Sequence, residues 1–192
     1  MDRLILATSS PRRKELFERF NIAYKAVDSS IVEKLNSTDT PLQYTMSLAF
    51  SKAYSVAKLY EKDIVIGADT IVVFKDEILG KPNDEKDAFR MLQLLSGNEH
   101  HVISGLSIIN LYSNTKIIDY DITKVKFRNL SSNNIQKYIE TKEPLDKSGA
   151  YGIQGLGGLL VERIRGSYYN VIGLPLVKLD ELLMKYFNRS LI

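Results

Sequence analysis

The stretch "DIVIGADTIVVF", residues 63–74, has the strongest influence on the predicted fold. Two apolar runs rich in β-branched residues flank a Gly-Ala-Asp-Thr segment, a pattern typical of buried strands. Asp69 carries a charge between these runs, and a buried charge costs several kcal/mol unless it is paired or binds a cation. Asp69 is therefore either a functional carboxylate or a turn residue whose side chain bonds its own backbone.

Outward from this stretch, short apolar runs alternate with amphipathic ones. Strand patterns lie at residues 4–7, 22–27, 101–110, 116–127 and 159–164, and helix patterns at 11–20, 41–60, 84–95, 131–144 and 174–187. Thr40 and Gln43 form a capping box in front of the second helix. This interleaving predicts an α/β domain over residues 1–192, a mixed twisted sheet with flanking helices that divides into two lobes with a cleft.

Composition narrows the classes of function. The chain has 192 residues, a formal net charge of +3 and no cysteine, which excludes disulfides, thiolate catalysis and cysteine-based zinc sites. Basic residues do not gather in a block, so no nucleic-acid-binding surface is predicted. The apolar runs are too short for a signal peptide or a membrane span, and we expect a cytoplasmic protein.

The segment "LILATSSPRRKEL", residues 4–16, contains a helix start with an unusual charge. Ser10 suits the N-cap position and Pro11 the first helical position. Arg12 and Arg13 follow, although cations are unfavourable at the positive end of a helix dipole. Either an anion binds between the backbone N–H groups and the guanidinium groups, or both arginines face water.

Two further segments contain candidate ligand-binding residues. In "ILGKPND", Lys81 lies between glycine and proline, but Lys75 and Pro82 break the P-loop template. Residues 143–175 are rich in glycine, which permits close approach of a ligand to the backbone, and glycine-rich turns are the alternative. Within this segment Tyr151 could offer a ring face and Gln154 an amide with donors and acceptors.

Taken together, these segments resemble the Maf family of nucleoside triphosphate pyrophosphatases. The motifs "LATSSPRRKEL", "VIGADTIVV", "LGKP", "LLSGNEHHVISGL" and "ETKEPLDKSGAYGIQG…YYNVIGLPL" occur in order from Leu4 to about Leu176. The resemblance implies a two-lobed fold like that of inosine triphosphate pyrophosphatases, with the nucleotide in the cleft. It also implies cleavage between the α and β phosphates, a divalent cation such as Mg²⁺ or Mn²⁺, and a homodimer.

The resemblance assigns roles to individual residues. Arg12 and Arg13, with Ser9 and Ser10 beside them, match the phosphate-binding turn of the family. Its basic residues correspond to Lys52 and Lys81, which would neutralise the triphosphate and the departing pyrophosphate.

Acidic and polar residues complete the implied site. Asp69 matches the catalytic aspartate of the family, the proton acceptor for the attacking water, and Glu33 matches an acidic residue near the metal. Both have oxygen ligands that suit Mg²⁺ or Mn²⁺, so Asp69 could equally be a metal ligand. Thr70 and Gln154, with Arg12, match positions tied to substrate choice.

Gln154 favours a pyrimidine substrate, dTTP or UTP, because an amide can accept from N3–H and donate to a carbonyl of the base. A second group of the family acts on 7-methyl-GTP and has an acidic residue near this position. The family is also linked with arrest of cell division, so a septum-formation regulator acting through a partner is another reading. A non-catalytic nucleotide-binding module is the third.

Overall fold

The computed structural model describes residues 2–31 and 39–192. Within these residues the strands are β1 (Leu4–Ala7), β2 (Lys25–Val27), β3 (Ile64–Phe74), β4 (Glu77–Leu79), β5 (Glu99–Asn110), β6 (Thr115–Phe127) and β7 (Val161–Arg165). They hydrogen-bond in the order β2-β1-β3-β5-β6-β7, and β4 pairs with β3. The pairing is mixed, since β1 is parallel to both β2 and β3, while β4 and β7 are antiparallel to β3 and β6.

Helices connect most of these strands. They are α1 (Pro11–Arg19), α2 (Pro41–Ala57), α3 (Glu85–Leu95), α4 (Ser132–Glu140), α5 (Tyr168–Ile172) and α6 (Leu176–Phe187). Three short 3₁₀ helices, η1 (Glu143–Asp146), η2 (Ser148–Ala150) and η3 (Leu156–Leu160), lie between α4 and β7. Within the described residues, none of the helices is both long enough and apolar enough to cross a membrane.

The predicted fold class is confirmed, because the described chain forms a mixed α/β structure with flanking helices. The capping box is present, with the Thr40 side chain accepting from the Gln43 N–H and the Gln43 side chain accepting from the Thr40 N–H. Residues 64–74 form one continuous strand that includes the Gly-Ala-Asp-Thr segment between the two apolar runs. The sequence patterns did not indicate α5, which has five residues.

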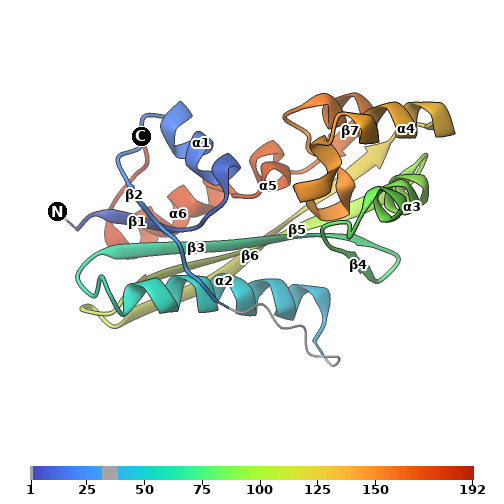
Figure 1. Ribbon diagram of the computed structural model, residues 1–192. Coiled ribbons are helices and arrows are strands. Elements are labelled where there is room, and N and C mark those ends of the chain that lie inside the picture. Colours follow the sequence, from blue (N-terminus) through green and yellow to red (C-terminus); the bar gives the residue numbers. More distant parts are fainter. Residues whose placement is uncertain (1, 32–38) are drawn as a thin grey trace. The chain divides into compact units, whose positions relative to one another are not determined.

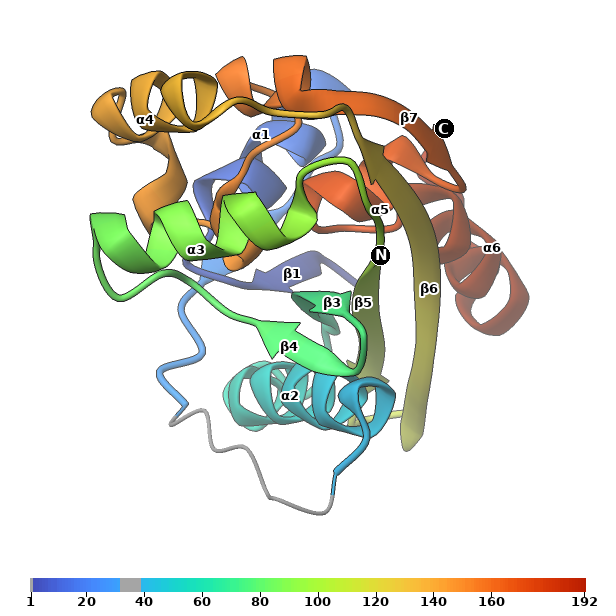
Figure 2. The same cartoon turned by 90° about the vertical axis from the view of Figure 1, so that its right-hand side faces the viewer.

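The described chain divides into two compact units. Unit 1 contains the described residues of Met1–Asp69, Ser104–Asp121 and Gly173–Ile192, and unit 2 contains Thr70–Ile103 and Ile122–Ile172. In unit 1, α2 lies on one face of the strands, and α1 and α6 lie on the other (Figure 1). In unit 2, β4 turns back beside β3 and leads into α3 (Figure 2).

The backbone of α2 touches the sheet of unit 1 at two glycines. A Cβ atom on Gly67 of β3 would lie 2.4 Å from the Ala49 carbonyl oxygen and 2.7 Å from the Ala53 nitrogen. On Gly105 of β5, a Cβ atom would lie 2.5 Å from the Thr45 carbonyl oxygen. Helix and sheet therefore approach each other more closely than any side chain at these positions would allow.

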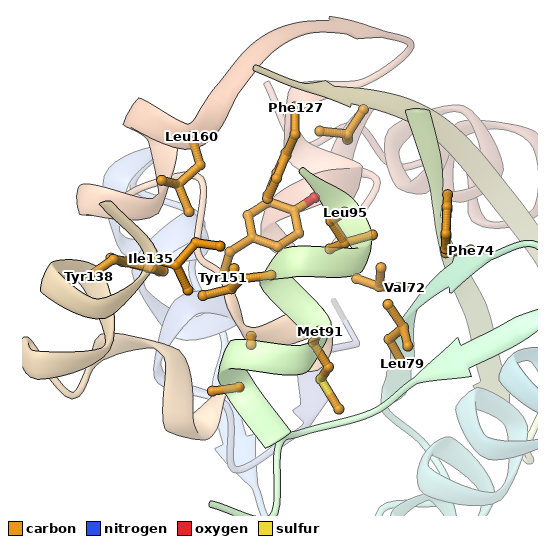
Figure 3. Close-up of a cluster of buried hydrophobic side chains, with 14 of the residues drawn as sticks. Val72, Phe74, Leu79, Met91, Leu95, Phe127, Ile135, Tyr138, Tyr151 and Leu160 are labelled. Carbon is orange, nitrogen blue, oxygen red and sulfur yellow. The ribbon is translucent and has the colours of Figure 1, made fainter. Parts of the chain in front are cut away.

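A cluster of buried hydrophobic side chains, most of them aliphatic, forms the core of unit 2. The Tyr151 ring lies in the middle of this cluster beside Phe127, with 4.8 Å between the ring centroids (Figure 3). The Tyr151 hydroxyl is 2.8 Å from Nε2 of the fully buried His100. Burial, with a smaller contribution from the neighbouring His101, lowers the pKa of His100 to about 3, so this ring is neutral.

The glycine contact between α2 and β3 yields a stability prediction. Gly67→Ala should lower the free energy of unfolding by about 1–3 kcal/mol, because the new methyl group would overlap the α2 backbone. Chemical denaturation measures the effect, and Gly80→Ala is the control because a Cβ atom there meets nothing within 4 Å. Equal stability of the two variants would contradict the close approach described above.

Candidate active site

Lys52 and Asp69 form a short ion pair within unit 1. Lys52 Nζ lies 2.6 Å from Asp69 Oδ1. Asp69 follows Gly67 by two residues on β3, so the two share one face of the strand, the face against which α2 packs. Lys52 follows Ala49 by three residues on α2, which keeps it on the helix face that meets the sheet. The glycine contact therefore directs the lysine toward the carboxylate.

The Lys52–Asp69 pair is largely shielded from water. The side chains are 13% and 11% exposed, whereas those of the Lys124–Glu99 pair in unit 2 are 43% and 37% exposed. Asp69 lies in the interior of a strand and bonds a lysine distant in sequence, so the alternative of a turn aspartate is wrong. A shielded carboxylate beside a cation is a common feature of sites that transfer protons or stabilise developing charge.

The segment between β1 and α1 places the two arginines in different environments. Ser10 has the extended backbone of an N-cap, but its hydroxyl makes no capping hydrogen bond to α1 in the described structure. Its own N–H bonds the Thr8 hydroxyl at 3.1 Å, which closes a tight turn. Arg12 is half-buried. Arg13 is buried, and its Nε donates to the Gly173 carbonyl oxygen at 2.7 Å, so the view that both arginines face water is wrong.

Comparison with known proteins identifies the family. The family model described as Maf-like protein matches residues 3–186. The chain belongs to the Maf family. A Clostridioides difficile (strain 630) protein named dTTP/UTP pyrophosphatase is 52% identical over 188 residues, covering 98% of this chain and 97% of that protein. An Alkaliphilus oremlandii (strain OhILAs) protein of the same name is 45% identical over 193 residues, covering both chains completely.

Similarity to solved structures is more distant. The Ham1 protein of Staphylococcus aureus superposes with a TM-score of 0.44 at 13% identity, over 66% of this chain and 72% of that chain. Membership of the Maf family rests on the family model and on the curated relatives.

In this Maf-family chain, unit 2 brings together Lys81 and the glycine-rich segment. The Gly80 carbonyl oxygen accepts the Gly149 N–H at 3.0 Å, which fixes the turn that carries the exposed Lys81. Nearby, the Ser148 hydroxyl donates to the Thr70 carbonyl oxygen at 3.4 Å. Thr70 itself, and Gly80 just before Lys81, thus bond residues 148 and 149 of this segment.

The glycine-rich segment itself differs from the sequence-based expectation. Gln154 is exposed and available to a ligand, but Tyr151 is buried, and its ring makes T-shaped contacts with His100 and Phe127. Several of the glycines lie against side chains of this same chain rather than leaving space for a ligand. Local sequence patterns do not reveal those contacts, because partners such as Val72 of β3 and Tyr138 of α4 come from other parts of the chain.

The remaining predicted residues are Ser9 and Glu33. Ser9 is exposed in the segment before α1. Glu33 lies outside the described residues. Over residues 2–31 and 39–192, no three His, Cys, Asp or Glu side chains gather as a candidate metal site. Of the two predicted metal ligands, Glu33 and Asp69, only Asp69 therefore lies among the described residues. Its carboxylate forms an ion pair with Lys52 in unit 1.

The buried ion pair predicts a strong energetic coupling. Lys52→Met should lower the free energy of unfolding by about 3 kcal/mol, because a shielded carboxylate loses its paired cation. Adding Asp69→Asn should restore part of that loss, since an amide needs no counter-charge. Urea denaturation of the single and double variants gives the coupling energy.

The Lys124–Glu99 pair provides the control for this double-mutant cycle. Because it is far more exposed, Lys124→Met and Glu99→Gln should couple by less than about 1 kcal/mol. An equally small coupling energy between Lys52 and Asp69 would contradict the conclusion that their ion pair is shielded from water.

Proposed function

We propose that this chain hydrolyses nucleoside triphosphates between the α and β phosphates, releasing a nucleoside monophosphate and pyrophosphate. The observation that carries the proposal is the shielded pair in which Lys52 Nζ lies 2.6 Å from Asp69 Oδ1. Hydrolysis of a phosphoanhydride needs a proton acceptor for water and fixed positive charge near the phosphates. The relatives at 52% and 45% identity that are named dTTP/UTP pyrophosphatase support the same reaction.

In the proposed step, Asp69 takes a proton from water as the water oxygen bonds the α phosphorus. The bond from that phosphorus to the bridging oxygen breaks, and the electron pair leaves with pyrophosphate. The hydrogen bond from Lys52 fixes the orientation of the carboxylate in advance, so little reorganisation accompanies proton transfer. Lys52 also offsets part of the negative charge that the substrate brings.

The turn before α1 is the proposed phosphate site. Ser9, Ser10 and Arg12 would bind phosphate oxygens there, assisted by the positive end of the helix dipole. Arg13 has a supporting role as well, because its bond to the Gly173 carbonyl oxygen ties α1 to the segment before α6. In unit 2, the exposed Lys81 is the proposed cation for the departing pyrophosphate.

A hard divalent cation, Mg²⁺ or Mn²⁺, fits the residues present. Mg²⁺ is commonly held by one or two carboxylates together with substrate phosphates and water, and Asp69 supplies one such carboxylate. Glu33 is the second proposed ligand. When bound, the cation would draw charge from the phosphate oxygens and so favour attack by water.

Gln154 is the residue proposed to recognise the base of the substrate. Its amide can accept a hydrogen bond from N3–H and donate one to a carbonyl of uracil or thymine, which favours UTP and dTTP. It is exposed, so both groups of the amide can reach a ligand.

The catalytic role of Asp69 is tested with an isosteric substitution. Asp69→Asn should lower kcat by about 10²-fold or more, because an amide cannot accept the proton from water. Release of pyrophosphate from UTP and dTTP, measured with Mg²⁺, Mn²⁺ or a chelator, gives the rates. Asp63→Asn is the matched control, since Asp63 is equally buried and paired with Arg3 but has no proposed catalytic role. Near-normal turnover of Asp69→Asn would remove Asp69 from the mechanism.

Substrate choice is tested at Gln154. Gln154→Glu replaces the amide donor with an acceptor that opposes a base carbonyl, an effect of about 2–4 kcal/mol, or a 30- to 1000-fold drop in kcat/KM for UTP and dTTP. Activity on 7-methyl-GTP should fall much less or rise. Gln136→Glu on the exposed face of α4 is the control. A similar decline for every triphosphate would show that Gln154 supports the phosphates or the turn rather than the base.

A further inference from the structure

The carboxylate of Glu143 is the centre of a hydrogen-bond network in unit 2. Its Oε2 accepts the N–H of Leu156 at 2.9 Å, and its Oε1 accepts the N–H of Gly157 at 3.0 Å. The Tyr138 hydroxyl donates to Oε1 at 2.8 Å and accepts the N–H of Gly152 at 3.2 Å. Three backbone N–H groups of one turn therefore depend on a single carboxylate, two directly and one through Tyr138.

The glycines of this turn fit around the same two side chains. A Cβ atom on Gly155 would lie 2.4 Å from Glu143 Oε2, and one on Gly157 would lie 2.5 Å from the Tyr138 hydroxyl oxygen. A side chain at either position would displace the carboxylate or the hydroxyl from the backbone. The glycine spacing in "GIQGLGG" is thus explained by contacts inside the protein, and these contacts need a carboxylate of the length of Glu143.

The ionisation of both groups suits these hydrogen bonds. Burial by itself raises the pKa of Glu143, but the N–H groups of Gly157 and Leu156 and the Tyr138 hydroxyl together hold that pKa below its usual range. Burial, and then the hydrogen bond to Glu143, raises the pKa of Tyr138, so its hydroxyl remains a donor. Hydrogen bonds to an ionised carboxylate are stronger than neutral ones, so the turn is firmly held.

Gln154 lies midway between the anchored groups, two residues after Gly152 and two before Leu156. We propose that Glu143 is a positioning residue that, with Tyr138, holds the 152–157 turn so that the Gln154 amide is fixed for base selection. This inference rests on the proposed function. A side chain held in its binding orientation loses less entropy when the base arrives, and misplacement by about 1 Å can cost as much as 10²-fold in rate.

Three variants separate the parts of the network. Glu143→Gln exchanges one accepting oxygen for a donor, Glu143→Ala removes both oxygens, and Tyr138→Phe removes the link to Gly152 while keeping the ring. We expect kcat/KM for UTP to fall by about 10- to 100-fold in Glu143→Ala, mainly through KM, and less in the other two variants. Activity on 7-methyl-GTP should change much less. Glu162→Gln, an exposed carboxylate on β7 that pairs with Arg163, is the control.

A double-mutant cycle with Gln154 distinguishes the positioning role from a purely structural one. A purely structural role of Glu143 would leave the effect of Gln154→Glu on kcat/KM the same in both backgrounds. In the wild-type background Gln154→Glu should lower kcat/KM for UTP by at least about 30-fold, but in Glu143→Ala the same change should cost less than about 5-fold. Amide hydrogen exchange over residues 152–157 should become faster in all three variants and stay unchanged in Glu162→Gln.

Each outcome distinguishes this inference from the proposed function. Faster exchange with an unchanged preference for UTP over 7-methyl-GTP would overturn the positioning role, while the wild-type activity would stand. An equal effect of Gln154→Glu in both backgrounds would overturn it as well. Wild-type protein that releases no pyrophosphate would overturn both proposals. If Glu143→Ala does not fold, the same measurements of hydrogen exchange and of KM for UTP on Tyr138→Phe test the positioning role.

Discussion

The close approach of α2 to the sheet at Gly67 and Gly105 is the constraint on which the site in unit 1 depends. At both positions a Cβ atom would lie within 2.5 Å of a carbonyl oxygen of α2, so backbone packs directly against backbone. Larger residues would separate helix and strand by the width of a side chain and move Lys52 away from Asp69. A pairing distance of 2.6 Å is therefore a consequence of residues that have no side chain at all.

Two partly or largely buried carboxylates illustrate different ways to stabilise a negative charge. Asp69 lies beside the ammonium group of Lys52, a full positive charge. Glu143 accepts hydrogen bonds from backbone N–H groups and from a tyrosine hydroxyl, all of them neutral donors. A carboxylate bonded to several fixed N–H groups is well suited to hold a backbone in one conformation. A carboxylate in a strand interior beside a lysine ammonium group is better suited to chemistry with an anionic substrate.

Much of the fold could be predicted from local patterns, and the failures have identifiable causes. The capping box at Thr40 and the apolar run through residues 64–74 located α2 and β3, because caps and periodicity are local properties of the chain. The short α5 contains too few residues to show a period. Tyr151 was expected at a ligand because it lies among glycines, but its hydroxyl bonds His100, a residue 51 positions away in the sequence.

The α/β class, the family motifs and the types of residue that could act on a triphosphate can all be read from the order of the amino acids. The sequence also marked Asp69 as costly to bury, since a charge between two apolar runs is visible without a structure. The partners of the charged groups, in contrast, follow from the folded chain: Lys52 for Asp69, Gly173 for Arg13, and the 152–157 turn for Glu143. Residue types and spacing record local preference, whereas a hydrogen bond or ion pair depends on distances that the folded backbone sets between remote segments.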